Sequence, residues 1–165
     1  NSSAASDVYK RQAWLSSQKR LKGDPEVALA MAGGAPLNAV KDITGLTLDA
    51  KASATLRDLL ARGRSLTPDS IVRGYSASMG IPAVALHLSR WCYDLLRVKS
   101  GADPHFFIRE KDVLEKIAAD ATMKNLLSLN AAVAEMRRSA EHPLAPRQVW
   151  EGVLLVYVRA LGGQV

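Results

Sequence analysis

Apolar residues recur every three or four positions from Asp24 to the end of the chain, and proline or glycine interrupts them at short intervals. This is the period of an α-helix, whereas the strict alternation that marks a half-buried strand is almost absent. Thr67-Pro68 and Ile81-Pro82 each place a proline at a helix start, where its missing amide hydrogen leaves no hydrogen bond unmade. The pattern predicts an all-α fold, a bundle of helices joined by short turns.

The predicted helices share an apolar face and a stop signal, usually glycine or proline. They span residues 25–32, 36–44, 48–62, 68–79, 81–99, 110–121, 124–140 and 146–161. Thr47 is the expected N-cap of the third. The helix over 81–99 has the clearest stripe, because Leu88, Trp91 and Leu95 follow one another at steps of three and four. The irregular segment that follows it, 101–109, is expected to be held against the core by its two phenylalanines.

The last predicted helix is apolar on almost every side. Trp150, Leu154 and Tyr157 form its main stripe. Further apolar residues lie outside that stripe: Val149, Leu155, Val156 and Val158. A helix of this kind is buried on more than one side. Two interpretations follow, a central core helix or a helix that also faces another subunit.

No set of residues has the spacing of a catalytic or metal-binding motif. Cys92 is the only cysteine, so it has no partner for a disulfide within the chain. His87, His105 and His142 are too scattered for a metal-ligand motif, and no GxSxG elbow is present. We therefore predict no catalytic residue, no cofactor and no metal site.

The formal net charge of +6 favours an anionic partner. The basic residues form small groups at 19–22, 62–64, 90–99 and 137–138, each near a helix end or on a polar face. Solvated helix surface is the default explanation, and a DNA-binding module would need these groups to converge on one face. Contact with DNA is therefore expected to be weak or indirect.

No apolar run approaches the roughly 20 residues that cross a bilayer. The lone cysteine fits a reducing compartment. We expect a cytoplasmic protein without a membrane partner. Residues 1–12, NSSAASDVYKRQ, contain a string similar to a translated adapter or assembly junction, and we expect them to be a non-native leader.

Several short motifs point to one family. AWLSSQ at 13–18 and PEVALAMAGGAPLNAV at 25–40 resemble the lid of bacterial clamp-loader AAA+ subunits, in which a small-residue turn separates two short helices. SRWCYDLLRVKSGA at 89–102 is similar to the tryptophan-bearing helix of the collar domain. AEMRRSAEHPLAPRQVWEGVLLVYVRAL at 134–161 resembles the closing helix pair of that domain. The match is closest to the delta prime subunits of DNA polymerase III.

This resemblance implies a lid remnant over 13–46 and a helical collar domain over 47–165. It places Leu37 where the active ATPases of the family have a nucleotide-sensing arginine, which favours the non-hydrolysing delta prime type over gamma/tau. The implied partners are delta and gamma/tau subunits in a hetero-pentamer that loads the sliding clamp on primed DNA.

The best candidates for subunit contacts are apolar residues of the two tryptophan-bearing helices: Trp91, Leu95, Trp150, Leu154, Leu155 and Tyr157. An equally good interpretation places both tryptophans in the core. Three other functions stay open: a gamma/tau or delta-type collar, a stand-alone basic helical module that binds DNA, and a small helical enzyme, which would need a pocket with convergent polar groups.

Overall fold

The computed structural model describes Lys10 and residues 48–140 and 145–165. Within 48–140 and 145–165 the chain is helical and contains no strand, so the all-α prediction is confirmed for this part. The α-helices are α4 (Ala50–Ala61), α5 (Pro68–Gly74), α6 (Ile81–Lys99), α7 (Lys111–Ala119), α8 (Met123–Ser139) and α9 (Pro146–Ala160), with 3-10 turns at Gly63–Ser65 and Ile108–Glu110. The helices predicted over 25–32 and 36–44, the lid remnant over 13–46 and Leu37 lie outside the described residues.

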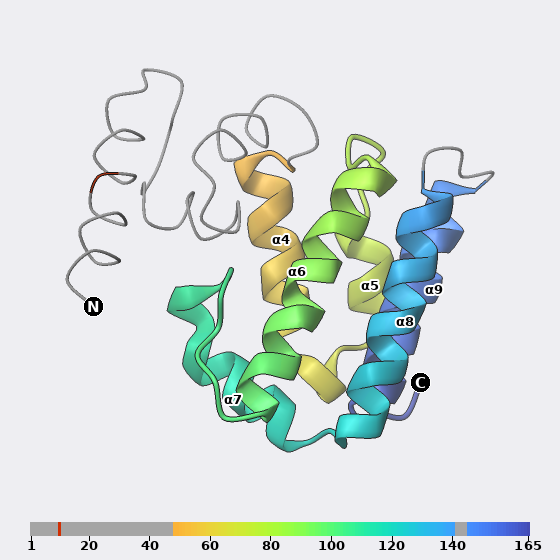
Figure 1. Cartoon of the computed structure of the whole chain (residues 1–165). Helices are drawn as coiled ribbons and strands as arrows, with labels where there is room; N and C mark the ends of the chain where they lie inside the picture. Colours follow the sequence, from red (N-terminus) through yellow and green to blue (C-terminus); the bar gives the residue numbers. More distant parts are fainter. Residues whose placement is uncertain (1–9, 11–47, 141–144) are drawn as a thin grey trace.

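Helix α6 lies at the centre of the bundle (Figure 1). It packs most extensively against α8 and α7, while α9 packs behind α8 and also touches α5. The predicted stripe of α6 is confirmed, since Leu88, Trp91 and Leu95 are at most 1% exposed. One continuous apolar core therefore joins all six helices.

The start of α4 differs from the prediction. Its N-cap is Asp49 and not Thr47, and the Asp49 carboxylate accepts a hydrogen bond of 2.7 Å from the amide of Ala52. A carboxylate at this position both satisfies a free amide and complements the positive end of the helix dipole. Thr67 caps α5 as predicted, because its hydroxyl accepts from the amide of Ser70 at 3.2 Å.

Helix α5 ends at Gly74, although the sequence predicted that it would continue to residue 79. In a continuing helix the amide of Tyr75 would bond to the carbonyl of Ile71. That carbonyl instead accepts a 2.8 Å bond from the indole nitrogen of Trp150, and Tyr75 is extended. A contact made from α9 therefore occupies this carbonyl at the end of α5, and Gly74 is a local stop signal that the prediction passed over.

The phenol of Tyr157 joins three helices inside the core. Its oxygen accepts a 3.1 Å bond from the indole nitrogen of Trp91 on α6 and donates a 2.7 Å bond to the carbonyl of Leu60 on α4. Burial raises the pKa of this phenol, so it stays protonated and able to donate. Each of these polar groups would be costly to bury without its partner.

Replacing Tyr157 with phenylalanine should lower the free energy of unfolding by about 1–3 kcal/mol, because two buried groups lose their hydrogen-bond partner. Urea unfolding followed by circular dichroism measures this loss. Tyr75→Phe is the matched control, since Tyr75 is only half-buried. Equal stability of the two variants would contradict the role of the Tyr157 hydroxyl.

Candidate functional site

The structure places most of the predicted subunit-contact residues in the core. Side chains at five of these positions are at most 1% exposed: Trp91, Leu95, Trp150, Leu154 and Tyr157. Leu155, the sixth of these residues, is partly exposed to solvent. The burial matches the interpretation of the tryptophans as core residues. A partner that binds α6 or α9 would therefore have to contact other side chains of these helices.

Groups that could carry metal or nucleophilic chemistry do not cluster in the described part of the chain. No set of three or more His, Cys, Asp or Glu side chains comes together there. Burial raises the pKa of Cys92 to about 12, so its thiol is protonated at neutral pH and is a poor nucleophile. No described helix is long and apolar enough to cross a membrane.

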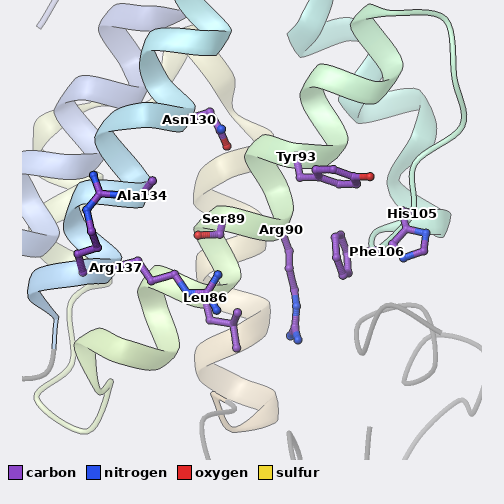
Figure 2. A pocket seen from close by; sticks show the side chains of 10 residues that line it. Leu86, Ser89, Arg90, Tyr93, His105, Phe106, Asn130, Ala134 and Arg137 are labelled. Atoms are coloured by element: carbon purple, nitrogen blue, oxygen red, sulfur yellow. The ribbon is translucent and has the colours of Figure 1, made fainter. Parts of the chain in front are cut away.

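A groove of about 840 Å³ lies between α6, α8 and the segment that follows α6 (Figure 2). We call it the basic groove. The residues that line it are Leu86, Ser89, Arg90, Tyr93, His105, Phe106, Asn130, Ala134, Arg137 and Arg138. Among these described residues three are arginines, three carry rings and none is acidic, so the groove suits an anionic ligand.

Helical spacing explains why these side chains meet. Ser89 and Arg90 precede Tyr93 by four and three residues, about one helical turn, and the three share the face of α6 opposite its core stripe. Asn130 and Arg137 share a face of α8 in the same way. Because α6 and α8 pack side by side, Arg90 and Arg137, which belong to separate basic groups of the sequence, line one groove (Figure 2).

A buried carboxylate fixes the third wall of the groove. Asp94 is 0% exposed, and its oxygens accept hydrogen bonds of 2.7, 2.8 and 2.7 Å from the amides of His105, Phe106 and Phe107. These three bonds compensate the cost of burying the charge. They also hold the segment after α6 in one position against the helix, a role that the sequence analysis gave to the two phenylalanines of the segment.

The anchored segment points its rings in opposite directions. Phe107 enters the core, 3% exposed, and packs edge-on against Trp91 with ring centroids 4.9 Å apart. Phe106 turns outward, where its centroid lies 4.8 Å from that of His105 and 5.6 Å from that of Tyr93. The outward rings form the aromatic end of the basic groove (Figure 2).

Arginine side chains border these rings. The guanidinium of Arg90 lies over the Phe106 ring at 5.4 Å from its centroid, and that of Arg97 lies 5.9 Å from the centroid of Tyr93. Such contacts orient the arginines without neutralising them. Arg138 forms an ion pair with Glu135 on the same helix, at 2.5 Å. Arg90 and Arg137 line the groove from α6 and α8 respectively.

Sequence reasoning missed the role of Asp94. A signal was present, because Asp94 follows Trp91 by three residues and His87 by seven, so it lies on a face that the helix buries. An acidic residue at such a position requires partners. Its partners are backbone amides, however, and nothing in the sequence marks which amides come close enough to bond.

Asp94→Asn should destabilise the fold by about 2–4 kcal/mol. In the wild type three amides donate to two carboxylate oxygens, whereas the asparagine side chain has one acceptor oxygen and no charge. Thermal and urea unfolding measure the effect. Asp58→Asn is the matched control, since Asp58 is exposed. A loss at Asp94 no larger than at Asp58 would contradict the anchoring role.

His87 is a second buried polar group, 5% exposed, and its Nε2 atom has no hydrogen-bond partner in the described structure. Burial, reinforced by the positive charges of Arg57 and Arg90, lowers its pKa from 6.5 to about 3. The unfolded chain therefore takes up a proton between these two pH values and the folded chain does not. Above pH 6.5 the titration of His87 does not change the free energy of unfolding, and as the pH falls toward 3 it lowers that free energy increasingly.

Replacing His87 with leucine should remove this part of the pH dependence. Between pH 6.5 and pH 3, wild-type stability should fall more steeply than that of the variant, by up to about 1.4 kcal/mol per pH unit. Urea unfolding of both proteins across this range gives the difference. Parallel stability curves would contradict this, because they would mean that His87 takes up its proton in the folded chain over the same pH range as in the unfolded chain.

No family model, no curated protein and no solved structure matches this chain. The clamp-loader resemblance therefore stays a prediction from the sequence motifs.

Proposed function

We propose that this chain is a helical assembly module of the clamp-loader collar type, the C-terminal part of a delta prime-like subunit of DNA polymerase III. In this role it binds sibling delta and gamma/tau subunits, and the assembled ring loads the sliding clamp on primed DNA. The work of the module is to supply contact area and fixed geometry to a neighbour. No chemical step is assigned to it.

One observation carries this proposal, an apolar flank on α9 that the core covers only in part, since Val149 and Ala160 are half-buried against the core. Val149, Gly152, Val156 and Ala160 recur at steps of three and four and so share one side of the helix. Val156 is 37% exposed, and a Cβ atom at Gly152 would meet nothing within 4 Å. We call these four residues the α9 flank.

The chemistry of the α9 flank suits another helix as partner. Its side chains are small and uncharged, so a second backbone can approach closely, and burying them would remove apolar surface from water. The sequence interpretation that α9 also faces another subunit is supported here by residues other than those first chosen.

The family motifs supply the identity of the partner. Helix α9 corresponds to the last helix of the closing pair in the clamp-loader resemblance, and α6 corresponds to the tryptophan-bearing collar helix. A gamma/tau or delta-type collar would use the same kind of surface. The delta prime type is preferred because Leu37 stands where the active ATPases of the family have a nucleotide-sensing arginine. The stand-alone nucleic-acid module is a different class of function, which the basic groove raises again below.

The test is co-purification of the full chain with delta and gamma/tau subunits of a related bacterium, read as the mass of the complex. Wild type should form a stoichiometric assembly. Val156→Glu should abolish it while leaving the unfolding midpoint nearly unchanged, because the residue is exposed and a buried carboxylate is costly in an interface.

Leu127→Glu is the matched control, since it places the same charge at an exposed leucine of α8, 54% exposed. It should assemble like wild type. A folded wild-type chain that stays monomeric with both partners present would refute the proposed function. Equal loss in both variants would refute the α9 flank as the contact surface.

A further inference from the structure

The basic groove joins charge and exposed rings in a way that the assembly role does not require. We propose that it binds single-stranded nucleic acid, with its arginines on phosphate groups and Tyr93 against a base. This inference is independent of the proposed function, because the groove lies between α6 and α8 whereas the proposed subunit contact lies on α9.

The charge of the groove is arranged for a phosphate chain. Arg90 extends from α6 and Arg137 from α8, so arginines of two helices line the groove (Figure 2). Arg137 forms no ion pair with any residue that the structure describes. No described lining residue is acidic, so an entering phosphate meets no carboxylate within the groove. Planar guanidinium groups bind phosphate oxygens well.

The rings supply the second element of single-strand binding. Tyr93 is 45% exposed, and it stands beside Phe106 and His105 at the mouth of the groove. The bonds from Asp94 hold the backbone of the two other rings in place. Binding therefore finds the aromatic wall already ordered, which reduces the entropy lost on association. Proteins that bind single strands commonly combine such stacking rings with a positive groove.

Other anionic partners fit less well. An amphipathic peptide helix needs an apolar groove, and here only Leu86 and Ala134 of the lining are aliphatic. Duplex DNA keeps its base faces stacked inside, so it would leave the ring of Tyr93 unused. An unpaired strand alone offers both a phosphate chain and accessible base faces to one concave surface.

The experiment measures fluorescence anisotropy of a labelled oligothymidylate, about 15 nucleotides long, titrated with the full chain at several salt concentrations. Arg137→Ala should weaken binding and reduce the salt slope by about 0.7, the value for one lost phosphate contact. Tyr93→Ala should weaken binding by about tenfold with little change in the salt slope, because it removes stacking and no charge.

Two controls separate this role from a structural or general electrostatic one. Tyr93→Phe keeps the ring and should bind like wild type, and an unfolding midpoint of Tyr93→Ala close to that of wild type excludes a folding defect as the cause of its weaker binding. Lys116→Ala removes a positive charge from α7, outside the groove, and should bind like wild type.

Several outcomes would overturn the proposal. These are no binding at low salt, equal loss in Arg137→Ala and Lys116→Ala, or duplex binding as tight as single-strand binding. Competition by polyglutamate as effective as by unlabelled oligonucleotide would assign the groove to an acidic peptide instead. Val156→Glu should bind the oligonucleotide normally, so failure of the assembly proposal would leave this test intact.

Discussion

The arrangement of the surface depends on one buried charge. Asp94 lies on the buried face of α6 and has no exposed area. Its carboxylate accepts hydrogen bonds from three consecutive backbone amides. The bonds turn the segment after α6 back along the helix, so that Phe107 fills the core while Phe106 and His105 stand beside Tyr93. Because a charge without partners is far more costly inside a protein than in water, this segment has little freedom to take another course.

Hydrogen bonds from three large side chains determine how the helices meet. Tyr157 connects α4, α6 and α9 through one hydroxyl, which bonds to the indole of Trp91 and to the carbonyl of Leu60. The indole of Trp150 donates a hydrogen bond to the carbonyl of Ile71 in α5. Apolar contact alone tolerates many relative positions of two helices, whereas a buried donor must find an acceptor at a defined distance and angle. These contacts make the bundle specific, and they explain why its most conspicuous aromatic residues lie inside it.

Two surfaces remain for function, and they have opposite chemistry. The α9 flank is small and uncharged, which suits a helix of a neighbouring subunit. The basic groove combines guanidinium groups with exposed rings, which suits a phosphate chain with unpaired bases. A module with both surfaces could hold a subunit and a strand at the same time, since the two lie on different helices.

The sequence by itself determined the fold class, nearly all of the described helices and the core stripe of α6, because periodicity and capping act over a single turn of chain. It also identified α9 as a helix with more apolar surface than one core contact needs. Only the tertiary structure decided that Asp94 anchors the segment after α6 and that Arg90 and Arg137 share a groove. Each of these depends on groups far apart in the sequence, and their distance in space is fixed by helix packing, which no local pattern encodes.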